Sequence, residues 1–100
     1  MKELSNKQTK IIDENKSNIY YSDLIRIVVG NISGDGLTIA EMKQRMKIID
    51  VCAAARKKKN EALKFEDEDF KLIKSKVEAH RWGVINKEII QFSDDVQAVK

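Results

Sequence analysis

The sequence contains no proline, one cysteine and one histidine, and each shortage excludes something. Without proline, no residue in the chain forbids a helix, which favours a helix-rich protein. Cys52 alone cannot form a disulfide within the chain, and Cys52 with His80 cannot supply the four ligands of a structural zinc site. No apolar run approaches the roughly 18 residues of a membrane-spanning helix. We therefore expect no disulfide, no metal or other cofactor, and no membrane contact.

The composition predicts one small folded domain over residues 1–100. With 42% hydrophobic and 35% charged residues, the chain is too apolar to be disordered and long enough for one modest core. The net charge of +3 is small for a dedicated nucleic-acid binder, although residues 31–60 carry seven basic and three acidic side chains. The first ten residues show no signal-peptide pattern, which together with the lone cysteine favours a reducing cytosol.

The N-terminal third predicts a short hairpin after a frayed lead-in. Residues 1–6 show no pattern and are expected to be frayed. Two β-branched and aromatic runs, Thr9–Asp13 and Ser17–Tyr21, then flank a polar turn. This arrangement predicts a hairpin over residues 7–21, with a loop as the alternative.

Residues 22–100 are predicted to be helical. Ser22 is placed to cap a helix that runs to Ile32, although the apolar run there also allows a buried strand. The best-marked helix runs from Thr38 to Arg56, because Thr38 and Glu41 have the spacing of a capping box.

Further elements follow after residue 60. Leu63–Phe65 is expected to be a short strand that pairs with the hairpin. A helix from about Asp67 to Trp82 begins in an acidic run, which the helix dipole favours, and Asn86 caps a last helix. The predicted fold is α-dominated α+β, with three to four helices packed with a short N-terminal β-hairpin.

Two apolar stripes favour interaction with another helix or another copy of the chain. On the helix from Thr38 the stripe is expected to face the core, and it consists of Ile39, Met42, Met46, Ile49 and Ala53. On the last helix a similar spacing predicts an oligomer interface formed by Ile85, Ile89, Phe92 and Val96. Together these stripes exceed what one small core requires, so we expect a homo-oligomer or a complex with a protein partner.

A basic ridge is the main alternative signal. Its candidate nucleic-acid or anion contacts are Lys43, Lys47, Arg56, Lys57, Lys58 and Lys59. No glycine-rich phosphate loop or pair of stacking aromatics accompanies them. A helix-turn-helix is disfavoured, because the connection before Thr38 is long and the following helix starts Ile39-Ala40-Glu41 rather than with base-reading side chains. Nucleic acid is therefore the second choice of partner.

Several stretches resemble small, mostly uncharacterised bacteriophage-encoded proteins of similar length. The matching pieces are Ile11–Asp13, Ser22–Leu24, the GLTIAEMKQRM segment of residues 36–46, the LKFEDEDFKLIK segment of residues 63–74 and RWGV at Arg81–Val84. The resemblance implies a virion or assembly component, or a factor that binds a host or phage protein, in the host cytoplasm or the virion. It brings no catalytic residues.

The function expected from the sequence is therefore a non-enzymatic protein-interaction or assembly component. No enzyme is expected, because no nucleophile, metal-ligand set or phosphate loop can be assembled from these residues. The alternative is a small DNA- or RNA-binding regulator that uses the ridge between Lys43 and Lys59.

Overall fold

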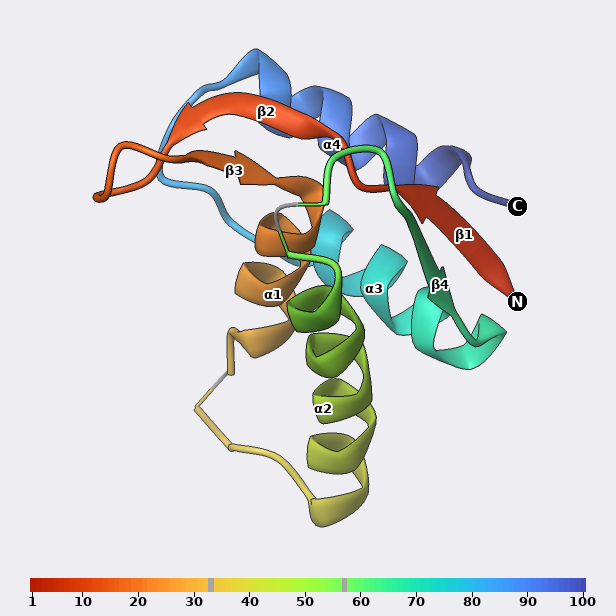
Figure 1. The fold of residues 1–100 in the computed structure, drawn as a ribbon. Coiled ribbons are helices and arrows are strands. Elements are labelled where there is room, and N and C mark those ends of the chain that lie inside the picture. Colours follow the sequence, from red (N-terminus) through yellow and green to blue (C-terminus); the bar gives the residue numbers. More distant parts are fainter. Residues whose placement is uncertain (33, 57) are drawn as a thin grey trace.

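A computed structural model describes residues 1–32, 34–56 and 58–100 of the chain, and these form four helices and two small antiparallel sheets (Figure 1). The elements are, in order, β1 (Lys2–Ser5), β2 (Gln8–Ile12), β3 (Asn18–Tyr20), α1 (Tyr21–Gly30), α2 (Ile39–Ala54), β4 (Ala62–Phe65), α3 (Asp67–Ala79) and α4 (Lys87–Ala98). The predicted α+β class is confirmed, with four helices making up the larger part.

The central element is α1, which packs against α2, α3 and β3. Apolar residues on several of its sides are buried, among them Leu24, Ile25 and Val29, so the same run that allowed a strand is a core helix. Its start differs from the prediction. Ser22 is fully buried within the helix, and the first turn is instead closed by Asp23, which accepts a 2.9 Å hydrogen bond from the backbone N–H of Tyr20.

The first residues of the chain form a strand, so the prediction that residues 1–6 are frayed is wrong. β1 pairs with β4, with Leu4 opposite Leu63, and both leucines are buried. The prediction that β4 pairs with the hairpin is therefore also wrong. The strand was missed because Leu4 is one apolar residue among polar neighbours, and its pairing partner lies about sixty residues away in sequence.

Asn6, which follows β1, ties three parts of the chain together. Its side-chain oxygen accepts a hydrogen bond from the backbone N–H of Ser22 at 2.8 Å, and its amide donates to the carbonyl of Ala55 at 3.0 Å. Its backbone N–H donates to Glu61 and its carbonyl accepts from Asn60. Asn6 is fully buried and links the start of α1 to the end of α2 and the loop before β4.

The predicted hairpin is confirmed, since β2 and β3 pair around the turn at residues 13–17. Buried Thr9 locks it by donating a 2.6 Å hydrogen bond to the carbonyl of Ile19. At the other end, Asn86 caps α4 as predicted and accepts the N–H of Glu88. The acidic run does begin α3, but this helix ends at Ala79, three residues before the predicted end at Trp82.

Candidate protein-interaction surface

The start of α2 is set by the capping box that the sequence predicts. The hydroxyl of Thr38 accepts the backbone N–H of Glu41 at 3.2 Å, and the carboxylate of Glu41 accepts the backbone N–H of Thr38 at 3.1 Å. These hydrogen bonds, the backbone one first, lower the pKa of Glu41 below its ordinary value. Gly36, with φ of +73°, makes the turn that leads into the cap.

The side of α2 that faces the core carries Arg45, Ile48 and Cys52, all of them buried. Arg45 explains this orientation. Its guanidinium donates to the carbonyls of Val29 at 2.9 Å and Asn31 at 3.1 Å, at the C-terminal end of α1. These carbonyls have no partner within their own helix, and α1 has no basic residue in its last turn. A buried arginine on α2 therefore supplies the missing donors and turns the opposite side of α2 outward.

The outward side carries most of the stripe that the sequence assigns to the core, so that assignment is wrong except at Ile49, which packs against the core. Ile39, Met42 and Met46 are 65%, 50% and 51% exposed. Further along the helix, Ile49 is half-buried and Ala53 is exposed. We call this set the α2 apolar face; it consists of Ile39, Met42, Met46, Ile49 and Ala53.

The α2 apolar face continues onto α1. Ile27 is half exposed and, together with Ile49, lines a depression of about 400 Å³ between the two helices and the hairpin, whose rim also carries Asp13, Asp23 and Arg26. Single exposed apolar side chains are common on protein surfaces, but a continuous row is not, and such rows mark interaction sites. Methionines add adaptability, because their flexible thioether side chains fit many partner shapes.

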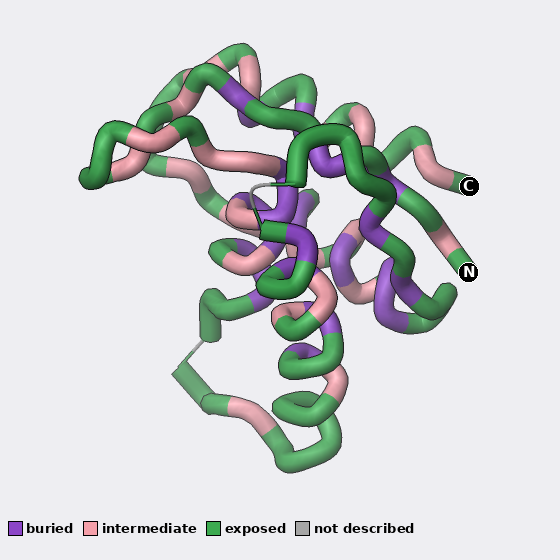
Figure 2. Tube along the Cα trace, viewed as in Figure 1, coloured by how far each residue is buried: buried purple, intermediate pink, exposed green. Residues whose placement is uncertain are grey.

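The N-terminal half of α2 extends away from both sheets and from α4 (Figure 1). All residues from Ile39 to Lys43 are exposed, and burial on α2 begins only at Gln44 and Arg45 (Figure 2). No residue of this end of the helix is buried by the described part of its own chain.

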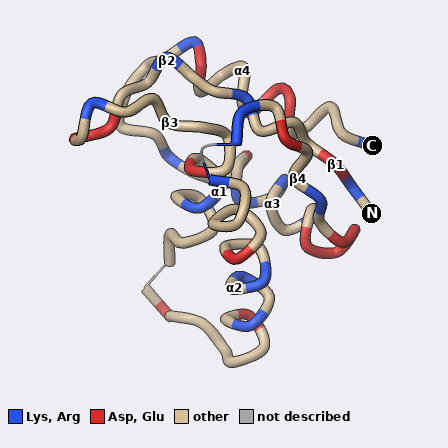
Figure 3. The backbone as a smooth tube through the Cα atoms, viewed as in Figure 1, with Lys and Arg blue, Asp and Glu red and all other residues tan. Residues whose placement is uncertain are grey.

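Much of the charge of the predicted basic ridge is already neutralised within the chain. Lys47 lies 3.2 Å from both Glu66 and Asp69 at the acidic start of α3 (Figure 3), and these carboxylates, Asp69 first, raise the pKa of Lys47. Asp69 itself is buried, which explains why it keeps a cationic neighbour.

The rest of the ridge lies beyond α2, which ends at Ala54, rather than in its last turn. Arg56 pairs with Asp23 at 3.7 Å, and Lys58 lies 3.9 Å from Glu61. Lys43 and Lys59 are exposed, and Lys57 lies outside the described residues. The candidate anion contacts therefore form no single unpaired cluster in the described part of the chain.

The oligomer interface predicted on α4 is corrected by the structure. Ile89, Phe92 and Val96 are buried, and the ring of Phe92 meets that of Tyr21 edge-on with centroids 5.0 Å apart. Phe92 and Val96 belong to the hydrophobic core of the chain itself. Only Ile85, in the connection before α4, is exposed, and it is fully so.

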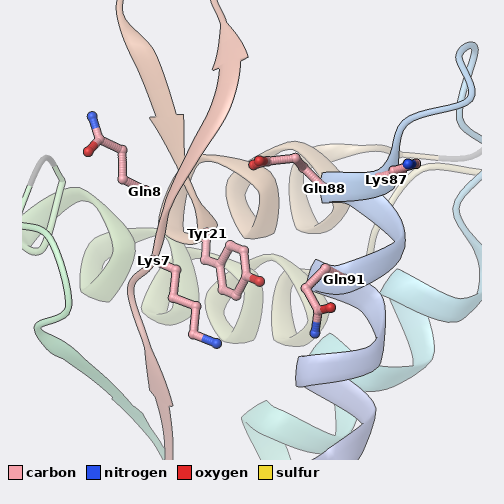
Figure 4. A pocket seen from close by; sticks show the side chains of 6 residues that line it. All are labelled: Lys7, Gln8, Tyr21, Lys87, Glu88 and Gln91. Carbon is pink, nitrogen blue, oxygen red and sulfur yellow. The ribbon is translucent and has the colours of Figure 1, made fainter.

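A polar depression of about 350 Å³ lies between α4 and the loop after β1 (Figure 4). Tyr21 and Lys7 both reach Asp95, with oxygen–oxygen and nitrogen–oxygen distances of 2.6 and 3.2 Å. Burial, then Asp95, raises the pKa of Tyr21. Burial opposes ionisation of Asp95, but hydrogen bonds from Tyr21, Gln91 and Lys7 lower its pKa overall. These contacts with Asp95 tie α4 to the start of α1 and to the loop after β1.

Cys52 and the His, Asp and Glu side chains are the groups that nucleophilic or metal chemistry would use. Burial raises the pKa of the Cys52 thiol to about 12, so the nucleophilic thiolate does not form near neutral pH. Within residues 1–32, 34–56 and 58–100, His, Cys, Asp and Glu side chains make no group of three that could hold a metal ion. Among the helices described, none combines the length and the apolar content needed to cross a bilayer.

Comparison of the chain with protein-family models, with curated proteins and with solved structures gives no match. The α2 apolar face is a row of exposed apolar side chains at helical spacing on one described helix.

Proposed function

We propose that the chain is a non-enzymatic protein-interaction component whose contact surface is the α2 apolar face. One observation supports this most strongly: Ile39, Met42 and Met46 form a row at helical spacing, each is at least half exposed, and a buried arginine holds the row outward. Burying such a row against a protein partner would stabilise the complex by about 25 cal/mol for each Å² of apolar surface removed from water.

An assembly role is part of the proposal, and its support is the sequence resemblance to small bacteriophage-encoded proteins. The GLTIAEMKQRM segment of that resemblance contains the first half of the α2 apolar face. Nucleic-acid binding is less supported, because Lys47, Arg56 and Lys58 are engaged with carboxylates. Nucleic-acid binding stays a prediction. A gel-retardation experiment with duplex DNA at about 50 mM salt would test it.

Site-specific photo-crosslinking in cells that produce the chain tests the proposal. A photoreactive residue at Met42 should form an adduct with a protein, whereas the same residue at Lys71, exposed on α3, should not. The adduct at position 42 should disappear in a second variant that carries Met46→Glu. Absence of any protein adduct at position 42, in a chain shown to be folded by circular dichroism, would refute the proposed function.

A further inference from the structure

The α2 apolar face is large at one end and small at the other. It begins with Ile39 and Met42, and it ends with Ala53, next to exposed Ala54. In a parallel pair of identical helices, Ile39 would face Ile39 of the other copy and Ala53 would face Ala53. The two small alanines would then leave a gap at that end of the interface. An antiparallel copy instead places Ile39 against Ala53 at both ends, so that large packs on small.

The charges beside this face have the same self-complementary pattern. Lys43 and Asp50 lie on one flank of the face, seven residues or about two helical turns apart. Both are exposed, and neither forms an ion pair with another residue in the described ranges. A two-fold axis beside Met46 and Lys47 brings Lys43 of each copy opposite Asp50 of the other, which makes two equivalent ion pairs.

The projecting end of α2 supports the same arrangement. Residues 39–43 are all exposed, whereas the second half of α2 carries the buried Ile48 and Cys52. In an antiparallel pair, this end lies beside the C-terminal half of the other α2, which is the half that is joined to the body of its chain. Each copy therefore covers the segment that the other leaves bare.

We infer that the partner of the α2 apolar face is a second copy of this chain, and that the two α2 helices pack antiparallel about a two-fold axis near Met46. This inference rests on the proposed function and names the partner of the same surface. The helix dipoles also oppose each other in this arrangement, which favours it over a parallel one.

A charge-exchange experiment tests the pairing. Lys43→Asp places two acidic residues opposite each other at both ends of the interface, and Asp50→Lys places two basic residues there. Each variant alone should dimerise about tenfold or more weakly than wild type in sedimentation velocity. An equimolar mixture should recover wild-type affinity, because every contact in the heterodimer then joins Asp to Lys. Lys71→Asp, with the same change in charge on α3, is the matched control and should dimerise normally.

Both substitutions suit the fold, because Lys43 and Asp50 are exposed and their replacement opens no cavity in the core. Circular dichroism of each variant should therefore match wild type. Failure of the mixture to recover, or a wild-type dimer insensitive to either substitution, would overturn the antiparallel pairing.

The two proposals fail separately. A wild-type chain that stays monomeric, but crosslinks through position 42 to a different protein, refutes self-association and leaves the interaction surface intact. A chain that stays monomeric and gives no protein adduct at position 42 refutes both.

Discussion

Ile48 and Met46, two residues apart on α2, give the sharpest test of which side of this helix faces the core. Ile48 is completely buried and belongs to the hydrophobic core, whereas Met46 is half exposed. Isoleucine-to-alanine substitutions in cores cost about 2–5 kcal/mol, and the complete burial of Ile48 places Ile48→Ala at about 3–4 kcal/mol. Met46→Ala should change the stability of the monomer by less than about 0.5 kcal/mol, because it opens no cavity.

The assay is urea unfolding followed by circular dichroism at about 1 µM chain, where self-association contributes little to stability. For a domain of this size, a loss of about 3 kcal/mol also lowers the melting temperature by roughly 12–24 °C. The refuting result is a reversal, in which Met46→Ala costs several kcal/mol and Ile48→Ala costs almost nothing. That outcome would mean that the apolar stripe faces the core, as the sequence pattern predicts.

Three further substitutions test the framework around this surface. Asn6→Ala leaves the buried N–H of Ser22 and the carbonyl of Ala55 without partners, so urea unfolding should show a loss of about 2–4 kcal/mol; a loss below about 1 kcal/mol would contradict this role. Thr38→Ala removes the cap of α2 and should cost about 1 kcal/mol in thermal unfolding, and no change would mean that the capping box is not formed in solution. Folding lowers the pKa of Asp95, so its ionised carboxylate stabilises the fold fully above the ordinary pKa of 3.8, and this contribution is lost as the pH falls through the lower pKa of the folded state. Asp95→Asn should therefore make the free energy of unfolding less dependent on pH in acid. An unchanged pH dependence would argue against the hydrogen bonds of Asp95.

The caps of α2 and α4 and the start of α3 were predictable because their signals are local, whereas the cap predicted at Ser22 for α1 was not found. Thr38 and Glu41 form their capping box, Asn86 caps α4, and the acidic residues from Asp67 onward begin α3. Each of these features depends on backbone groups within one helical turn, so neighbouring residues are sufficient to specify it.

The orientation of α2 was not predictable from periodicity, because α2 carries apolar residues on two sides. Ile48 and Cys52 fit the core as well as Met42 and Met46 would, and Arg45 decides between the two sides. A sequence pattern alone predicts that an arginine side chain is exposed at the surface, because arginine is rarely buried. Its place inside follows only from the carbonyls at the end of α1, which lie fourteen and sixteen residues away in sequence.

The N-terminal strand and the α4 residues show the same limit for contacts distant in sequence. Leu4 is buried beside β4, and Phe92 is buried in the core with Tyr21 against its ring; both contacts join segments far apart in the sequence. Apolar spacing on the last helix predicted an apolar face correctly. It could not show whether that face meets the same chain or another one, and the structure assigns it to the same chain.

Sedimentation velocity of the wild-type chain and of Met46→Asp, over a series of concentrations up to about 100 µM, tests the central claim most directly. The proposal predicts that the wild-type chain shifts toward twice its mass of 11.5 kDa as concentration rises, while folded Met46→Asp remains at the monomer mass. Equal behaviour of the two chains, whether both are monomers or both are dimers, would contradict the claim that copies of this protein meet through the α2 apolar face.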